Sequence, residues 1–387
     1  MKKALTYAIP VISAVVVFGA IMIIRNNQMD KAMGGLWPTL DGGVYEQAVK
    51  VGKLQYLVPP NEVVDGGVQA EDLPALNEPT FGSIAAEDEK LADDVSGIVV
   101  TSGSEARFYS FQILNWHYAV NDVIGGKNVA VTYSPLSGSV AVYDRGDMQL
   151  QASAKLYNNI MLLTDGSDSL WNQLNGQRVV GESVGEVLVS QPFAVMTWAS
   201  FKAAYPQGQA LSTETGHVRA YGIHPYGSYD NASSVYFPLN HLDSSQPLKA
   251  IMHAVANGGT TVLVPDVQVF ANNALNLEVG DLPVMGRFMD GDAVRFFDRR
   301  VEGVTLTFSV SSGGVVTDDQ TGSVWNGEGE AVSGEYRGVR LTQVVSMRSF
   351  AFAALAMYPQ AEVIGAVTGE AAAEADVPAE PIEINVE

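Results

Sequence analysis

Short apolar runs bounded by glycine-rich turns dominate the central part of the chain. Gly97–Thr101 and Ala106–Ser110, for example, flank the tripeptide Ser102-Gly103-Ser104. β-branched and apolar residues on both sides of such a turn predict a β-hairpin. Helical patterns are rarer, and the clearest is Ala194–Tyr205, which Pro206 ends. The pattern therefore predicts a β-rich α+β fold.

Three short motifs occur twice in the same order. The pairs are Tyr143-Asp144-Arg145 with Phe297-Asp298-Arg299, Ser169-Leu170-Trp171-Asn172 with Ser323-Val324-Trp325-Asn326, and Tyr205-Pro206-Gln207 with Tyr358-Pro359-Gln360. The first two pairs are separated by 154 positions and the third by 153. Such a conserved order predicts a tandem duplication into two homologous modules that share a core.

The repeat and the composition shifts divide the chain into six parts. We expect a signal anchor at 1–31, a linker or extended arm at 32–71, a first module at 72–212, a connector at 213–247, a second module at 248–365 and a disordered acidic tail at 366–387. The segment Glu370–Glu387 has six acidic and no basic residues, a composition that cannot bury enough apolar surface to fold.

The N-terminus predicts a membrane anchor. Lys2 and Lys3 precede an apolar run from Leu5 to Ile24. Twenty helical residues span roughly 30 Å, the thickness of the hydrocarbon core, and a basic N-terminus favours the cytoplasmic side. We therefore expect residues 5–24 to form a single transmembrane helix with the body of the protein outside the cytoplasm. A cleaved signal peptide and a buried core helix are the alternatives.

Composition excludes several functions. The net charge of −21 argues against binding to nucleic acid, because no basic stripe neutralises phosphates. The absence of cysteine excludes disulfides and thiolate chemistry. Phosphate-loop, dinucleotide-binding and zinc-protease motifs are also missing from the sequence. No cofactor is predicted, and only a bound cation stays open.

Residues 113–145 carry a series of closely spaced motifs: Ile113-Leu-Asn-Trp-His117, Asn121-Asp122, Gly125-Gly126, Val131-Thr-Tyr-Ser-Pro-Leu-Ser-Gly-Ser139 and Tyr143-Asp144-Arg145. This series resembles an uncharacterised prokaryotic family, domain of unknown function 3179, and the resemblance extends more loosely over about 72–365. Where that family usually has two cysteines, this chain has Ser134 and Ser137. The resemblance therefore implies a soft-metal or redox pair that these serines cannot form.

His117, Ser134 and Ser137 are the catalytic candidates, and they occur only in the first module. One interpretation places His117 near the serines as a remnant ligand or general base, with Asp122 or Asp144 completing a trio. The other makes His117 a buried side chain that holds a turn. No strained nucleophile elbow is present in the sequence.

Four aspartates precede the repeated tryptophans and are candidate metal ligands. Asp165, Asp168, Asp318 and Asp319 could offer oxygen ligands to a hard cation, but turn chemistry explains Asp beside Gly and Ser equally well. We expect Trp171 and Trp325 to be core residues. The alternative is a carbohydrate-stacking surface shared with the tyrosines of the connector.

These observations favour a membrane-anchored, extracytoplasmic structural or interaction protein at the cell surface, with self-association as one outcome of its repeated surfaces. Two alternatives stay open. One is an extracytoplasmic enzyme or metal-binding module centred on His117, Ser134 and Ser137, and the other is a glycan-binding surface protein.

Overall fold

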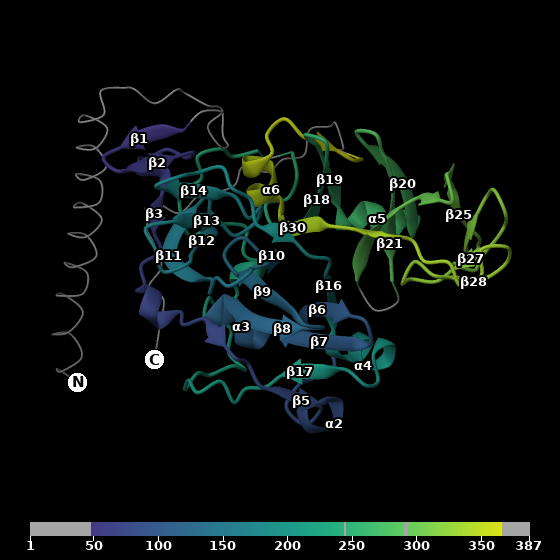
Figure 1. Ribbon diagram of the computed structural model, residues 1–387, viewed down its shortest axis with the longest axis horizontal. Helices are drawn as coiled ribbons and strands as arrows, with labels where there is room; N and C mark the ends of the chain where they lie inside the picture. The colour runs from purple at the N-terminus through teal and green to yellow at the C-terminus, as the bar shows by residue number, and fades with distance from the viewer. Residues whose placement is uncertain (1–47, 244, 290–292, 366–387) are drawn as a thin grey trace, which may run out of the picture.

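Strands dominate the protein, as the sequence predicts. A computed structural model describes residues 48–243, 245–289 and 293–365 (Figure 1). The helices of this part are all short: α2 (Ile84–Glu87), α3 (Phe111–His117), α4 (Trp198–Ala204), α5 (Asp266–Asn272) and α6 (Ala351–Met357), with 3-10 turns η1 (Pro60–Glu62), η2 (Ala70–Asp72) and η3 (Tyr229–Asn231). The prediction of a β-rich fold with few helices is confirmed.

The largest sheet contains strands from both halves of the chain. Its order is β31 (Glu362–Val363), β19 (Thr260–Pro265), β18 (Ile251–Asn257), β30 (Ser346–Phe350), β10 (Ser139–Asp144), β9 (Lys127–Ser134), β8 (Ala119–Ile124) and β4 (Leu76–Asn77), with β15 (Val189–Ser190) pairing at the edge of β10. The junction is the antiparallel contact of β10 with β30, where Val140 faces Arg348. Figure 1 shows β30 running from the β18–β19 region toward β10.

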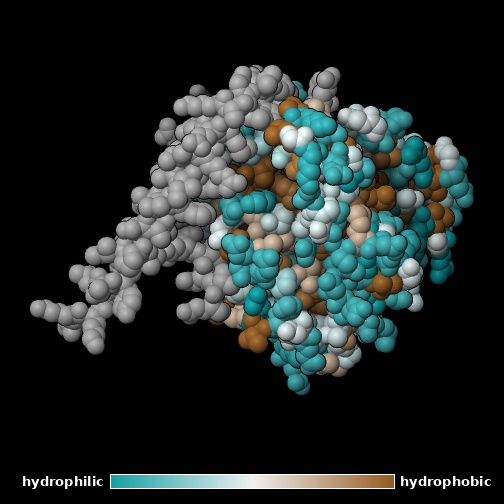
Figure 2. Space-filling model, turned by 60° about the vertical axis from the view of Figure 1, so that its left-hand side comes forward, coloured by the Kyte–Doolittle hydropathy of each residue, from teal (hydrophilic) through white to brown (hydrophobic). Residues whose placement is uncertain are grey.

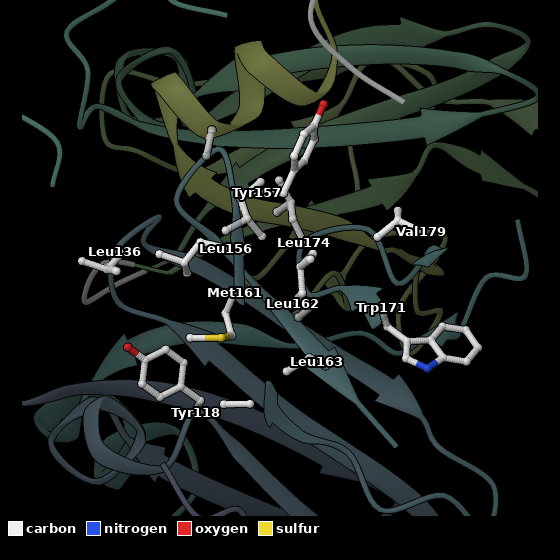
Figure 3. Packing of buried hydrophobic residues seen from close by; sticks show 14 of the residues in the cluster. Tyr118, Leu136, Leu156, Tyr157, Met161, Leu162, Leu163, Trp171, Leu174 and Val179 are labelled. Atoms are coloured by element: carbon white, nitrogen blue, oxygen red, sulfur yellow. The ribbon is translucent and has the colours of Figure 1, made fainter. Parts of the chain in front are cut away.

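A second sheet holds the main core of the first half. Its order is β1 (Val49–Val51), β2 (Leu54–Tyr56), β14 (Arg178–Gly181), β13 (Leu170–Asn172), β12 (Ile160–Thr164), β11 (Gln151–Tyr157) and β3 (Val64–Asp65). Labelled members of its apolar cluster, including Trp171 and Met161, are drawn in Figure 3. The same cluster includes Phe352 and Met357 of α6, so the second half of the chain helps to fill it.

Four smaller sheets complete the described part. The first contains β16 (Ala194–Thr197), β6 (Ser96–Ser102), β7 (Glu105–Ser110), β17 (Gln209–Leu211) and β5 (Phe81–Ser83). The second contains β20 (Ala274–Val279), β21 (Leu282–Phe288), β22 (Val294–Asp298) and β29 (Gln343–Val344), and the third pairs β23 (Arg300–Val301) with β24 (Val304–Thr305). The fourth contains β25 (Phe308–Val310), β26 (Val316–Asp318), β27 (Val324–Trp325) and β28 (Ala331–Ser333).

One order of elements occurs twice. The first set is β6, β7, α3, β8, β9 and β10, and the second is β18, β19, α5, β20, β21 and β22. Each element of the second set begins 155 positions after its counterpart in the first. Both sets therefore follow the pattern of two strands, a helix and three strands with the same spacing.

One local prediction was wrong in its boundary, and the neighbouring strands set the helix ends. α3 ends at His117 and β8 begins at Ala119. Tyr118, between them, has a φ of 60°, which stops the helix. The predicted helix Ala194–Tyr205 begins as strand β16, which pairs with β6, and becomes helical only at Trp198. Edge pairing overrides the local preference here.

The predicted arm is partly ordered against the body. Its described residues form β1, β2 and β3, which add to the edges of the seven-stranded sheet. The predicted anchor at 5–24 and the acidic tail at 366–387 lie outside the described residues. Within residues 48–243, 245–289 and 293–365, no helix has the length and apolar character that a membrane crossing needs.

Candidate functional site

Ser134 and Ser137 lie at the tight turn between β9 and β10. Ser134 ends β9 and faces Ser139, the first residue of β10, while Ser137 lies in the turn. All three serine side chains are buried. Ser137 Oγ lies 2.9 Å from Ser134 Oγ and 2.7 Å from Ser139 Oγ, within hydrogen-bonding distance of both hydroxyls. The structure thus brings the two candidate serines together, in the interior.

Further polar groups close this buried network. Ser139 donates to the side-chain oxygen of Gln173, whose amide nitrogen donates to Thr132 Oγ1 at 3.0 Å. The Met161 backbone N–H donates to Ser134 Oγ at 3.2 Å. Buried hydroxyls are costly unless they are paired, and here each has a protein partner. The network therefore stabilises the turn from inside.

The backbone of the same turn contacts the second half of the chain. The Ser137 carbonyl accepts the Phe350 N–H at 2.8 Å, and the Gly138 carbonyl accepts Arg348 Nη1 at 3.2 Å. Together with the Val140–Arg348 pairing, these contacts form what we call the seam, Ser137–Val140 against Arg348–Phe350. The serine motif is therefore part of the junction between the halves.

His117 ends α3 and is fully buried. Its Nδ1 donates to the Pro74 carbonyl at 2.7 Å, and its Nε2 lies 2.7 Å from Tyr221 Oη. The Tyr221 hydroxyl also contacts Thr215 Oγ1 at 2.5 Å. Burial lowers the pKa of His117 to about 4, so its ring is neutral at physiological pH. In that state Nε2 accepts the tyrosine hydroxyl proton.

The predicted trio does not assemble. Both ring nitrogens of His117 are occupied by Pro74 and Tyr221 rather than by a serine. Asp122 accepts instead from Tyr109 Oη at 2.6 Å and pairs with Arg107, and Asp144 accepts the Gly146 N–H at 3.0 Å. The chemistry of a base beside a nucleophile is therefore missing around Ser134.

A small pocket of about 250 Å³ opens beside the His117–Tyr221–Thr215 chain of hydrogen bonds. The walls are the segment Ala75–Thr80 and residues of the early connector, Leu211, Ser212, Glu214, Thr215 and His217. Thr215 belongs both to this wall and to the hydrogen-bonded chain. His117 is linked to the pocket through the Tyr221 hydroxyl and through the ring of His217, a wall residue whose centroid is 5.3 Å from that of His117.

The aspartate candidates occupy separate turns. Asp165 accepts the N–H and hydroxyl of Ser167, and Asp168 forms an ion pair with Lys53. Asp318 is buried and accepts from Trp325 Nε1 at 2.9 Å, whereas Asp319 is exposed. Across the described ranges, no group of three or more His, Asp or Glu side chains is placed to hold a metal ion. Trp171 and Trp325 are both buried.

The family of the chain follows from a comparison with family models. The model described as "Protein of unknown function (DUF3179)" matches residues 70–361. The chain belongs to this family. DUF3179 is thus confirmed over most of the body, including the turn with Ser134 and Ser137. No curated protein and no solved structure matches the chain.

Sequence reasoning missed the residues that surround the candidates in this DUF3179 chain. Tyr221 and Thr215 are more than 90 positions from His117, and Gln173 is 34 positions from Ser139. No motif spacing links such distant side chains. The tyrosine-rich composition of the connector was the one usable signal, and it pointed to a carbohydrate-stacking surface rather than to a partner of His117.

Asp318 tests whether the aspartate turns are structural. We expect Asp318→Ala to lower the free energy of unfolding by about 2–3 kcal/mol, because Trp325 and Thr321 lose a buried acceptor. The exposed neighbour Asp319→Ala should change it by less than about 0.5 kcal/mol. Urea denaturation of both full-length variants, with and without calcium, measures this. A calcium-dependent gain in stability that Asp318→Ala removes would contradict the structural role.

His117 should make the protein sensitive to acid. Its folded pKa of about 4 is below the unfolded value of 6.5, so the unfolded state binds the proton more readily between these values. The stabilisation is complete above pH 6.5 and decreases as the pH falls toward 4. We expect a loss of about 2 kcal/mol between pH 7 and pH 5.

The variant His117→Gln keeps a donor and an acceptor but does not titrate. Urea denaturation at pH 7 and pH 5 should show this pH-dependent loss in the parent chain and a loss about 2 kcal/mol smaller in the variant. His241→Gln, at a partly exposed histidine, is the matched control and should behave as the parent. Equal losses in the parent and His117→Gln would show that His117 is not buried in its neutral form.

Proposed function

We propose that the protein is a membrane-anchored, extracytoplasmic interaction protein in which His117, Ser134 and Ser137 are structural residues. The apolar run 5–24 with Lys2 and Lys3 supports the anchor and its orientation. The observation that carries the structural role is the seam. The Ser137 hydroxyl lies within the buried serine network, and the Ser137 carbonyl accepts the Phe350 N–H. The polar groups of the motif therefore make contacts that stabilise the fold.

We infer further that the body arose by tandem duplication. The constant spacing of 155 positions between corresponding elements supports this. The strand registers agree as well. In the first half Thr197 of β16 pairs with Ser96 of β6, and in the second half Phe350 of β30 pairs with Ile251 of β18, the equivalent position. The irregularity at Leu170–Trp171 against β14 returns at Val324–Trp325 against β28. A β-bulge is a specific feature, so its recurrence favours common descent of the halves.

The two halves differ in how their equivalent helices are covered. In α3, Gln112 and Asn115 line a small pocket together with Tyr221 and Ile223 of the connector. The corresponding positions 155 residues later, Val267 and Phe270 in α5, are 62% and 41% exposed. Phe270 packs one edge against the ring of Phe288 and leaves the rest of its surface open. Apolar side chains exposed to this extent favour an interaction surface.

A second copy of the chain is the occupant that we propose for α5. The net charge of −21 makes copies repel one another, so association requires an uncharged surface. The exposed residues of α5 are Val267, Phe270, Ala271 and Asn272, and none of them carries a charge. By contrast, on the face shown in Figure 2 hydrophilic residues predominate and hydrophobic ones occupy limited areas.

Light scattering of the full-length chain in detergent tests this self-association. We expect a dimer whose dissociation constant rises at least tenfold in Phe270→Glu, because the substitution places two like charges at the contact. Val332→Glu is the control, since Val332 is 45% exposed on β28, away from α5. A monomer at all concentrations, or equal dimerisation of Phe270→Glu and the parent, would contradict the proposal.

The pocket beside Thr215 favours a second candidate function, the binding of a small hydroxyl-rich ligand such as a glycan end. Its walls offer Ser212, Thr215 and Thr80 as hydrogen-bonding groups, beside Glu78 and Glu214. The connector tyrosines Tyr221, Tyr226 and Tyr229 are buried and serve the interior rather than a stacking surface. A glycan would therefore have to bind in the pocket, and a glycan array without signal would count against it.

A further inference from the structure

Three polar residues that no motif connects meet in the second half of the chain. His253 lies on β18, Asp266 is the first residue of α5 and Ser346 begins β30. His253 Nε2 lies 2.6 Å from Asp266 Oδ1, and Ser346 Oγ lies 3.4 Å from His253 Nδ1. The side chains of His253 and Asp266 are 5% and 17% exposed, while Ser346 is partly exposed.

Strand geometry explains this meeting. In the antiparallel pair of β18 and β30, Val255 faces Ser346 and His253 faces Arg348. Alternate residues share a face, so Ser346 lies diagonally across from His253 on that face. β19 pairs Val264 with His253 and ends one residue later, so α5 starts beside the histidine. Asp266 is therefore held next to the ring.

The hydrogen bonds define which ring nitrogen of the neutral histidine carries the proton. A carboxylate only accepts, so neutral His253 carries its proton on Nε2 and donates it to Asp266. Nδ1 then has a free lone pair toward the Ser346 hydroxyl. This is the chain of nucleophile, base and orienting carboxylate that activates a serine, with the two ring nitrogens interchanged relative to the serine proteases.

The first half has apolar residues at all three equivalent positions. Ile98 corresponds to His253 and Phe111 to Asp266, each 155 positions earlier. Phe193 corresponds to Ser346, 153 positions earlier, the offset that relates β16 to β30. Ile98 is fully buried, and Phe111 stacks on Tyr133 at a centroid distance of 4.2 Å. The fold is thus compatible with an apolar trio here. A polar trio at the same three places, hydrogen-bonded to one another, points to chemistry rather than to a folding requirement.

We propose that Ser346 is a nucleophile activated by His253 and oriented through Asp266, with carboxylic esters as its substrate class. The Ser346 hydroxyl proton passes to His253 Nδ1 as Oγ bonds to the acyl carbon. The ester C–O bond then breaks, and the leaving alcohol takes the proton from His253. Water, activated by the same nitrogen, hydrolyses the acyl-serine and restores the free hydroxyl. This inference goes beyond the interaction role and does not rest on it.

A fluorophosphonate probe tests the proposal on the full-length chain. We expect covalent labelling of Ser346, identified by peptide mass spectrometry, and no labelling of the exposed Ser333, which has no histidine partner among its described contacts. His253→Gln should lower the labelling rate at least tenfold, and Asp266→Asn should lower it to a smaller extent. Ser346→Ala should abolish it.

Two results would overturn the proposal. One is a folded parent chain that does not label at Ser346, a result that needs no variant. The other is labelling of His253→Gln at the parent rate while its circular dichroism and melting temperature match the parent. Hydrolysis of p-nitrophenyl acetate by the parent but not by Ser346→Ala would extend support from reactivity to turnover. None of these outcomes bears on dimerisation through α5, so the two proposals fail separately.

Discussion

The contact between β10 and β30 is the constraint on which the rest of the structure depends. It joins the strands β8, β9 and β10 of the first half to β18, β19 and β30 of the second in one sheet. At the seam, Phe350 donates to the Ser137 carbonyl, and the ring of Phe350 lies so close to Gly138 that an added Cβ would be 2.8 Å from it. Neither half therefore completes its sheet alone.

The seam also explains the positions of the polar residues. Ser134, Ser137 and Ser139 form hydrogen-bonded contacts beneath the turn that carries the contact, so their hydroxyls rigidify it from inside. Reactive chemistry needs a base beside a partly exposed nucleophile. Among the described residues, His253 and Ser346 meet that requirement and His117 does not, although β30 carries both Ser346 and the seam.

The sequence predicts the strand-rich fold and the family because both depend on local patterns, such as Ser102-Gly103-Ser104 between two apolar runs. It misplaces the helix at Ala194–Tyr205, since the pairing of β16 with β6 is decided by distant residues. The sequence does not predict the partners of His117 or the trio around His253 for the same reason. Tyr221 is 104 positions from His117, and Ser346 is 93 from His253. A resemblance directs attention to the serines, but only burial distinguishes a structural hydroxyl from a reactive one.

The most direct test of the seam compares Gly138→Ala with Gly146→Ala by urea denaturation of the full-length chain. Both glycines have positive φ, 58° and 53°, so backbone strain lowers the free energy of unfolding of each variant by a similar amount, about 1 kcal/mol. A Cβ at Gly138 would collide with Phe350, whereas one at Gly146 meets no atom within 4 Å. The seam predicts an additional loss of about 1–3 kcal/mol in Gly138→Ala. Equal losses in the two variants would contradict it.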